Sequence, residues 1–372
     1  MDASVPILFT IPNFITAGSG RAMLNIIERL DRARFEPAVC VMKKGGNLDR
    51  EVEKLGIPFI EAPFAIPAKP YTTLLFRAWN AAQILRSYHF QLWHSFHYSD
   101  DYTEPVIAKW AGAQWIYTKK NMNWFHRSWY VRTFLAKRVV AQNQDMINHF
   151  FNGVFKKKAR LISRGIDLNH FQPGVTKEPC LRKSLGIPEE AILAGCVAHL
   201  VPVKGHPTLL QAAAKISGIH VLIAGRPADQ EYVNSLKKLA VDLRISGRIH
   251  FLGDQTDINS FHAQVDIFVL PTWAKWRQEG CPVALLEAMA CGKACIATDI
   301  PGSRDIIENG TNGILIPSEN VDALAQAMKE MANSFSLRQR LGEAARKRIE
   351  DYFTIDKEVM AHEKLYSELL NL

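Results

Sequence analysis

Residues 279–292 have the sequence Glu-Gly-Cys-Pro-Val-Ala-Leu-Leu-Glu-Ala-Met-Ala-Cys-Gly, in which seven residues separate Glu279 from Glu287. Glu287 lies inside an apolar pattern with helical spacing, whereas Glu279 precedes that pattern together with Gly280 and Pro282. A proline near the first helical turn and free backbone amides around it make a helix N-terminus that favours anions. The stretch therefore predicts a buried helix that starts at a ligand site, although two ordinary surface glutamates would also fit it.

Outward from this stretch, short apolar strands alternate with amphipathic helices, a pattern typical of parallel α/β sheets. In the first half, the predicted strands are Pro6–Ile11, Pro37–Met42, Gln91–Ser95, Trp115–Thr118 and Arg138–Ala141. In the second half, they are Ala191–Val197, His220–Ala224, Ile249–Leu252, Ile267–Leu270 and Ala294–Ala297. The pattern restarts after a cluster of Pro173, Gly174, Pro179 and Pro188. Two domains are expected for 372 residues.

The charge of the chain is concentrated in its first half. The net charge is +8, but residues 1–170 alone contain 23 Lys or Arg and 13 Asp or Glu. Nucleic acid, an anionic membrane surface and a phosphorylated acceptor could each explain this positive field. No zinc-finger spacing, helix-turn-helix pattern or RNP-like aromatic pattern is present, so no nucleic acid partner is expected.

The cysteines and the apolar runs favour a cytoplasmic protein. The six cysteines are scattered without C-x-x-C spacing, as expected for reduced thiols. The start Met-Asp-Ala-Ser lacks the basic and apolar regions of a secretory signal, and no apolar run approaches the roughly 18 residues of a membrane span. We expect a cytoplasmic location, with peripheral attachment to the inner face of the membrane as a second expectation.

Residues 279–298 resemble the signature E-G-x-P-x-x-L-L-E-A-M-A-x-G-x-P-V-I-A-T of retaining GT-B glycosyltransferases, most closely glycosyltransferase family four (glycosyl transferases group 1). Other fragments are similar to family segments in the same order along the chain: Ala17-Gly18 with Arg21 and Asn25, Gly165–Asp167 with Phe171, Val203–His206, Pro301–Asp305 and Asp351–Leu370. The resemblance covers almost the whole chain, and the order and spacing of the fragments make it specific.

The resemblance implies an α/β GT-B fold of two facing Rossmann-like domains, with a C-terminal helix crossing back to the first domain. The acceptor-binding domain would be residues 1–170 with 353–372, and the donor-binding domain residues 171–352. The implied activity moves a hexose-type sugar from a UDP- or GDP-sugar to a hydroxyl of a glycan, lipid-linked or small-molecule acceptor. It further implies retention at the anomeric carbon, and neither a cofactor nor a metal ion.

The resemblance also assigns donor-binding residues. Lys204 would place its charge on the donor diphosphate, Glu287 would accept hydrogen bonds from the ribose, and Glu279 would lie at the donor sugar. The backbone around the helix start would bind sugar and phosphate, and the first domain's backbone at Gly18 and Ser19 would approach the phosphates. The residues at the helix start are Gly280, Cys281, Pro282 and Val283.

Three positions depart from the family pattern. His199 stands where the family usually has a phosphate-binding arginine, and Arg164 replaces the inter-domain asparagine. Lys120 aligns with the acceptor-domain histidine often described as catalytic; it could stabilise charge, but it cannot be assumed to act as a base. Further acceptor-side candidates are Asn121, His97 and Asp100. His97 and Asp100 fall on one loop with His94 and Asp101, and for each of these four a solvated loop or a satisfied core position is at least an equal alternative.

Residues 105–144 contain no Asp or Glu, seven Lys or Arg and four of the eight tryptophans. Residues 124–138 could form a basic helix that bears aromatics and contacts an anionic leaflet. A helix packed with its aromatics inward is the alternative. Other proteins that the sequence leaves open are a sugar-nucleotide epimerase, a glycogen-type phosphorylase, a non-catalytic GT-B subunit and a basic nucleic-acid-binding protein.

Overall fold

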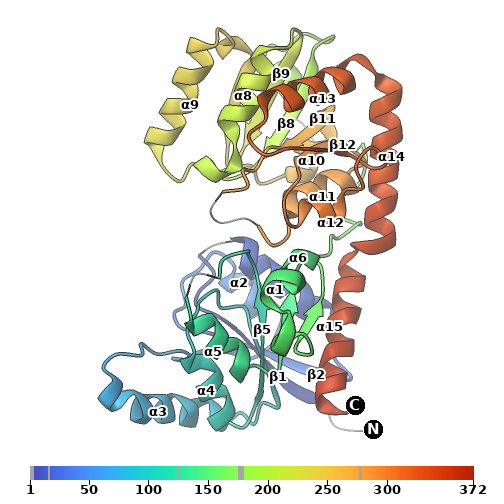
Figure 1. Cartoon of the computed structure of the whole chain (residues 1–372). Coiled ribbons are helices and arrows are strands. Elements are labelled where there is room, and N and C mark those ends of the chain that lie inside the picture. Colours follow the sequence, from blue (N-terminus) through green and yellow to red (C-terminus); the bar gives the residue numbers. More distant parts are fainter. Residues whose placement is uncertain (1–3, 16, 125, 175–179, 276–278) are drawn as a thin grey trace. The chain divides into compact units, whose positions relative to one another are not determined.

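The computed structural model describes residues 4–15, 17–124, 126–174, 180–275 and 279–372, which form two compact units (Figure 1). The first unit comprises Met1–Lys120, Trp124–Arg164 and Ile355–Leu372, and the second Asn121–Asn123 and Gly165–Thr354. Pro179 and Phe125, which belong to two of the predicted segments, lie outside the described residues.

The first unit is built on a seven-stranded parallel sheet with the order β3-β2-β1-β4-β5-β6-β7. Its strands are β1 (Val5–Ile11), β2 (Phe35–Val41), β3 (Phe59–Glu61), β4 (Leu92–Ser95), β5 (Gln114–Lys119), β6 (Arg138–Ala141) and β7 (Ala159–Leu161). Its helices are α1 (Ala17–Arg29), α2 (Asp49–Lys54), α3 (Leu74–Arg86), α4 (Thr103–Trp110), α5 (Ser128–Leu135), α6 (Gln144–Phe150) and α15 (Ile355–Leu370), with the short 3-10 helices η1 (Tyr71–Thr73) and η2 (Gly153–Phe155).

The C-terminal helix α15 is part of the first unit's core, as the resemblance predicts. It packs beside α1 on one face of the sheet, where Val359, Leu365 and Tyr366 join the apolar cluster. The Tyr366 hydroxyl forms a 2.7 Å hydrogen bond with Nδ1 of His94 on β4. This helix is therefore fixed to a sheet whose strands all end before residue 162, far from the helix in the chain.

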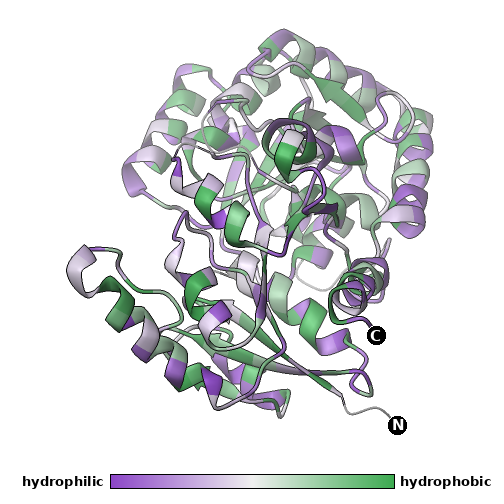
Figure 2. Cartoon of the chain, turned by 60° about the horizontal axis from the view of Figure 1, so that its bottom comes forward, coloured by the Kyte–Doolittle hydropathy of each residue, from purple (hydrophilic) through white to green (hydrophobic). Residues whose placement is uncertain are grey.

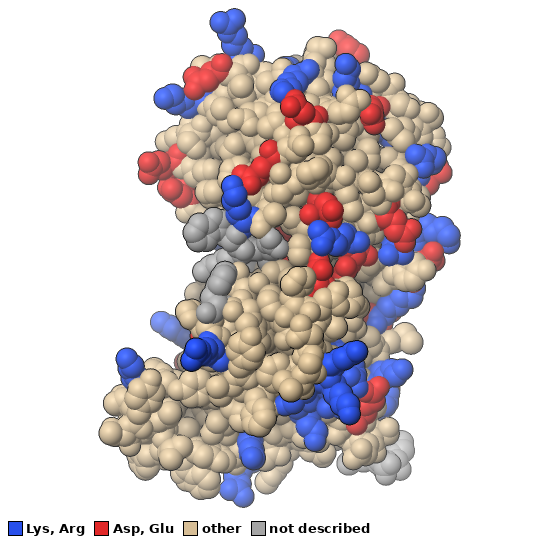
Figure 3. Space-filling view, in the orientation of Figure 1, with Lys and Arg blue, Asp and Glu red and all other residues tan. Residues whose placement is uncertain are grey.

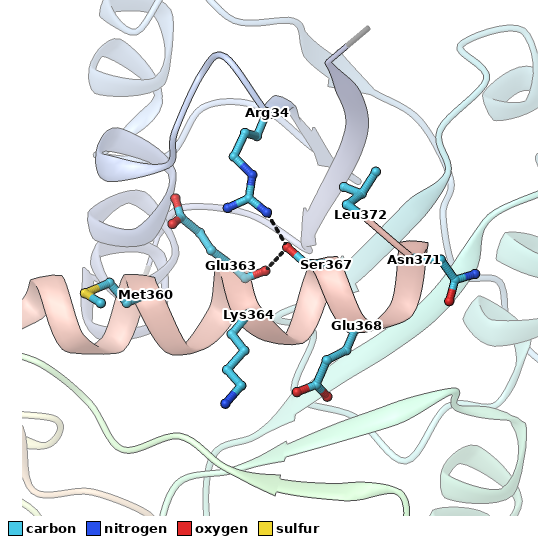
Figure 4. Close-up of a pocket in the computed structure, with 8 residues that line it drawn as sticks. All are labelled: Arg34, Met360, Glu363, Lys364, Ser367, Glu368, Asn371 and Leu372. Carbon is cyan, nitrogen blue, oxygen red and sulfur yellow. Dashed lines mark hydrogen bonds between the residues drawn. The ribbon is translucent and has the colours of Figure 1, made fainter. Parts of the chain in front are cut away.

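A shallow depression of about 540 Å³ follows the outer side of α15 (Figure 4). Arg34 points across it and donates a 2.7 Å hydrogen bond to the Ser367 hydroxyl, which in turn donates to the backbone carbonyl of Glu363. None of the candidate site residues lines it.

The second unit repeats the architecture with six parallel strands in the order β10-β9-β8-β11-β12-β13. Its strands are β8 (Ile192–Val197), β9 (Ile219–Ala224), β10 (Ile249–Gly253), β11 (Ile267–Leu270), β12 (Ala294–Thr298) and β13 (Ile314–Ile316). Its helices are α7 (Leu181–Ser184), α8 (His206–Ala214), α9 (Gln230–Asp242), α10 (Ile258–Gln264), α11 (Val283–Ala290), α12 (Ser303–Ile306), α13 (Val321–Asn333) and α14 (Phe335–Tyr352), with the 3-10 helices η3 (Pro202–Lys204) and η4 (Ser246–Arg248).

Alternate residues of the central strands of the second unit enter opposite cores, because side chains alternate across a sheet. Ile267 and Val269 of β11 pack with α8, α9 and α13, whereas Phe268 and Leu270 pack with α11 and α14. Both faces are thus covered, as parallel sheets require.

The structure confirms the α/β architecture, and each predicted strand is present with ends that differ by at most two residues. The strands β3, β7 and β13 were not predicted, because three residues are too few to show a periodicity.

The expected basic helix over residues 124–138 is wrong in extent. Helix α5 covers only Ser128–Leu135, and Ala136 after it is already extended, leading into β6. Its aromatic side chains are divided between interior and surface. Trp129 is buried and the preceding Trp124 stacks on Phe150, whereas Tyr130 and Phe134 are exposed. Arg132 of this segment is fully buried as well.

Candidate functional site

The strand order of the second unit reverses between β8 and β11. In open parallel sheets, ligands bind at such a switch point, outside the carboxyl ends of the two strands. The loop after β8 carries His199 and Lys204, and the loop after β11 carries Glu279. The topology therefore gathers three of the candidate donor-binding residues at one edge of the sheet.

A close approach of two backbones fixes the turn that presents Lys204. Gly205 follows Lys204 with a left-handed φ of +68°, and a Cβ atom there would lie 1.9 Å from the carbonyl oxygen of Pro271. The backbone N–H of Trp273 donates a 2.8 Å hydrogen bond to the carbonyl of Val203. The loops after β8 and β11 are therefore tied together, and only glycine fits at their contact.

The Lys204 ammonium donates a hydrogen bond to the carboxylate of Glu279. Its side chain is only 12% exposed, and this burial lowers the pKa of Lys204 to about 8. A buried cation is costly unless an anion accompanies it. The arrangement is suited to hold a second anion, such as a diphosphate, beside the ammonium group.

Glu287 lies within α11, the helix predicted from residues 279–292. It is half-buried, and burial raises the pKa of its carboxyl to about 8. No side chain or backbone N–H among the described residues donates a hydrogen bond to this carboxyl. A desolvated carboxyl without a donor is unfavourable, and hydroxyl groups of a bound ligand would satisfy it.

The start of α11 packs closely against the loop after β12. Gly302 has a φ of +86°, and a Cβ atom there would lie 2.8 Å from the carbonyl oxygen of Gly280. Pro282 caps the helix and is buried, whereas Cys281 is half-buried and Val283 is exposed.

Two buried hydroxyl groups at the same edge of the sheet have no partner among the described residues. The Thr272 hydroxyl follows β11 and the Ser303 hydroxyl starts α12, and neither makes a hydrogen bond to a described residue. Neither residue was predicted from the sequence as part of the site. Their positions shortly after predicted strands were the signal that could have identified them.

His199 is exposed, two residues after β8. The nearby depression between this loop and α9 has a volume of about 320 Å³, and its lining includes Asp229 and Glu231. Two carboxylates make this depression a poor place for a diphosphate, so the turn at Lys204 remains the better candidate for phosphate binding.

In the first unit, the strand order reverses between β1 and β4. Gly18 and Ser19 form the first turn of α1, after β1, where backbone N–H groups lack partners within the helix. A Cβ atom at Gly18 would meet no atom within 4 Å. Space is therefore open above this turn.

Lys120 follows β5 and donates a hydrogen bond from its ammonium to the carbonyl oxygen of Phe96, the residue after β4. Burial, reinforced by the charge of Arg164, lowers the pKa of Lys120 to about 7. The pKa of Lys120 thus lies near neutral pH. Asn121 belongs to the second unit, where it forms an isolated antiparallel β-bridge with Glu279.

His97 and Asp100 belong to a polar network that supports the loop after β4. His97 Nδ1 lies 3.5 Å from the carboxylate of Glu104, and Asp100 accepts a 2.5 Å hydrogen bond from Ser128. Glu104 is fully buried and pairs with Arg132 at 3.0 Å. Although burial alone would raise it, the neighbouring His97 ring and the charge of Arg132 hold the pKa of Glu104 at about 2.

The Glu104–Arg132 pair was not predicted from the sequence. Glu104 closes an Asp-x-x-Glu sequence at the start of α4, and Asp101 accepts hydrogen bonds from the backbone N–H groups of Thr103 and Glu104. That capping sequence was the available signal. Among the described residues, no group of three or more His, Cys, Asp or Glu side chains is placed to hold a metal ion.

Two family profiles together match most of the chain. The profile Glycosyl transferases group 1 matches residues 178–348, and the profile Glycosyltransferase Family 4 matches residues 16–170. The border between the two matches lies close to the border between the structural units.

Two similar proteins match parts of the chain. The lipopolysaccharide core biosynthesis glycosyltransferase LpsE of Rhizobium meliloti (strain 1021) is 32% identical over 162 residues, which cover 44% of this chain and 46% of that protein. A D-inositol 3-phosphate glycosyltransferase of Mycobacterium tuberculosis (strain ATCC 25177 / H37Ra) is 27% identical over 202 residues, which cover 53% and 41%. The matches thus span less than half the length of these relatives.

Solved structures share the fold over nearly the full length. A glycosyltransferase from Rickettsia africae ESF-5 superposes with a TM-score of 0.88 at 22% identity and covers 99% of both chains. Anabaena Alr3699/HepE, solved in complex with UDP and glucose, gives a TM-score of 0.82 at 20% identity over 97% of this chain and 99% of its own.

Proposed function

Because this chain belongs to the GT-B glycosyltransferases of family four (glycosyl transferases group 1), we propose that it transfers a hexose-type sugar from a UDP- or GDP-sugar to a hydroxyl acceptor. The carrying observation is the edge of the second unit's sheet. There Lys204 pairs with Glu279, and the half-buried Glu287 accepts no hydrogen bond from the described residues. A nucleotide sugar offers an anion for the first group and a ribose diol for the second.

In this proposal, Lys204 neutralises the charge that develops on the departing diphosphate. The ammonium exchanges the Glu279 carboxylate for the diphosphate, and the released carboxylate turns to hydroxyls of the donor sugar. Glu287 accepts hydrogen bonds from the ribose, and the backbone at Gly280–Val283 contacts sugar and phosphate. His199, in the loop after β8, donates a further hydrogen bond to the phosphates.

The first unit binds the acceptor in this proposal. Free amides at Gly18 and Ser19 approach the donor phosphates, while Lys120 lies where the acceptor hydroxyl reacts. Lys120 stabilises negative charge at that point, and its lowered pKa lets the charge vary near neutral pH. His97, Asp100 and Asn121 shape the acceptor side. The acceptor is a glycan, a lipid-linked or a small-molecule alcohol, reached at the inner face of the membrane.

Two further parts of the proposal rest on the family resemblance alone. The transfer retains the anomeric configuration of the donor, with the departing phosphate helping to remove the acceptor proton, and it needs no metal ion.

A thermal-shift screen of nucleotide sugars tests the proposed function. A ligand that binds only the folded protein raises the melting temperature by mass action, by about 2.7 kcal/mol of stability at 100 times its dissociation constant. We expect a UDP- or GDP-sugar to stabilise the parent and to lose this effect with Glu287→Ala. No stabilisation by any sugar nucleotide at millimolar concentration would contradict the proposal.

A further inference from the structure

Helix α3 of the first unit buries its small side chains and exposes its large ones. Ala78, Ala81, Ala82 and Leu85 are buried, and α3 packs against α4. Leu75 and Phe76 are each 68% exposed, Trp79 is 46% exposed, and Tyr71 in the preceding turn η1 is 64% exposed. Figure 2 shows green, hydrophobic residues on this helix at the lower left. We call Tyr71, Leu75, Phe76 and Trp79 the α3 face. A surface helix that only covered a sheet would have the opposite distribution.

The surroundings of the α3 face carry cations and no free carboxylate. Residues 62–99 and 105–144 contain no Asp or Glu at all. Between them, Asp100 accepts from Ser128, Asp101 caps α4, and Glu104 is fully buried. Exposed cations around α3 are Lys69, Arg86 and, on the adjoining helix α4, Lys109. In Figure 3, the region of α3 at the lower left shows blue atoms and no red ones.

The α3 face is held rigid before any partner arrives. Arg77 donates hydrogen bonds to the carbonyl oxygens of Pro67 and Pro70 and to the Thr73 hydroxyl, all of which lie at or before the turn η1. Trp79 contacts the Trp110 ring of α4 edge-on at 6.0 Å between centroids. Little ordering is therefore needed when this face is covered, which favours binding.

We propose that η1 and α3 dock the protein on an anionic lipid leaflet, with the α3 face inserted at the headgroup boundary. Aromatic and aliphatic side chains bury apolar area there, and lysine and arginine side chains around them attract anionic headgroups. The α3 face differs from residues 105–144, which bury Trp115 and Trp129, although α5 in that segment exposes Tyr130 and Phe134. Among the described helices, none is long and apolar enough to cross a membrane.

The charge argues for lipid rather than for a second copy of this chain. In a two-fold dimer through the α3 face, Lys69, Arg86 and Lys109 of one copy would lie close to the same three cations of the other copy, and like charges oppose such an interface. A leaflet rich in anionic headgroups instead offers a counterion to each cation. The docking needs no catalysis and stands apart from the proposed transferase activity.

Vesicle flotation of the full chain, without donor or acceptor, tests the docking. Vesicles of phosphatidylcholine alone are compared with vesicles that also contain phosphatidylglycerol, at about 0.1 M and about 1 M salt. We expect binding to the anionic vesicles only, weakened at high salt. The triple variant Leu75→Ser, Phe76→Ser, Trp79→Ser should lose at least about tenfold in partition, since these side chains supply the apolar area. The variant Lys69→Gln, Arg86→Gln, Lys109→Gln should lose about fivefold for each cation in contact.

A matched control replaces exposed apolar residues elsewhere, Val241→Ser, Phe335→Ser and Tyr352→Ser, and should float like the parent. Quenching of Trp79 by brominated lipid, obtained as the difference between the parent and Trp79→Phe, reports insertion. Equal flotation of the α3 triple variant and the control would overturn the proposal. So would parent binding that is equally weak for both vesicle types, or a parent dimer that the α3 variant converts to a monomer.

Discussion

At the residue scale, the lysine at the end of η3 offers the most direct test of the site. Lys204→Ala removes the cation that pairs with Glu279, and we expect a normal fold with roughly 100–1,000-fold slower turnover, the range for loss of one preorganised charge-stabilising group. Steady-state kinetics and circular dichroism measure both quantities. A turnover within about threefold of the parent would remove Lys204 from the site.

The two glutamates around the start of α11 should act on different parts of one donor. Glu287→Ala should weaken binding of both the free nucleoside diphosphate and the nucleotide sugar, because both contain the ribose. Glu279→Ala should weaken the nucleotide sugar much more than the free nucleotide, because it leaves the Lys204 ammonium unpaired and available to phosphate. Calorimetric titration of both variants with both ligands decides the assignment, and equal losses in all four titrations contradict it.

The raised pKa of Glu287 predicts that this residue reduces the free energy of unfolding more at high pH than at low pH. Its pKa is 4.5 as the ordinary value and about 8 in the folded protein, so between these pH values the folded state binds the proton more tightly than the unfolded state. The free energy of unfolding therefore falls as the pH rises from 4.5 to about 8, because Glu287 ionises more readily in the unfolded chain. Without nucleotide, Glu287→Gln should melt higher than the parent at about pH 8.5, with a smaller difference at about pH 5.

The control for this pH experiment is Glu190→Gln, since Glu190 is exposed in the same unit. Its melting temperature should follow the parent at both pH values. A Glu287→Gln advantage that is the same at both pH values would show that the gain has another origin than ionisation.

At the element scale, the contact between the loops after β8 and β11 can be tested through two glycines. Gly205→Ala places a Cβ atom 1.9 Å from the Pro271 carbonyl in a left-handed conformation, whereas Gly218→Ala, with a φ of +73°, meets no atom within 4 Å. Both variants should be destabilised by roughly 1–2 kcal/mol, because alanine adopts the left-handed conformation less readily than glycine. Only Gly205→Ala should lose further stability and nucleotide binding, as measured by urea denaturation and titration. Equal destabilisation of the two variants would mean that the loops are free to separate.

At the scale of the whole molecule, the chemical outcome of the transfer can be observed directly. We expect the product to keep the donor's anomeric configuration and the activity to survive EDTA, as the resemblance to family four implies. Proton NMR of the first product distinguishes retention from inversion. An inverted linkage refutes the first expectation, and complete loss of activity with the chelator, restored by a divalent cation, refutes the second.

The architecture of this protein could be predicted from local patterns in its sequence. The strands β8 to β12 and β1, β2 and β4 to β6 follow from apolar runs whose length and spacing depend only on neighbouring residues. The sequence also identified the family, because Glu279, Glu287 and the residues between them lie close together along the chain. Local pattern was sufficient wherever the relevant partners are near in sequence.

Contacts between residues that are far apart in the chain could be identified only from the three-dimensional structure. Lys204 meets Glu279 across 75 residues, Tyr366 meets His94 across 272, and no local pattern carries such distances. The acid-free segment 105–144 has the composition of a surface, yet it places Trp129 and Arg132 in the interior, while α3 exposes Leu75 and Phe76. The reason is physical: composition sets which residues can be buried, but the packing of helices on a sheet selects which of them are.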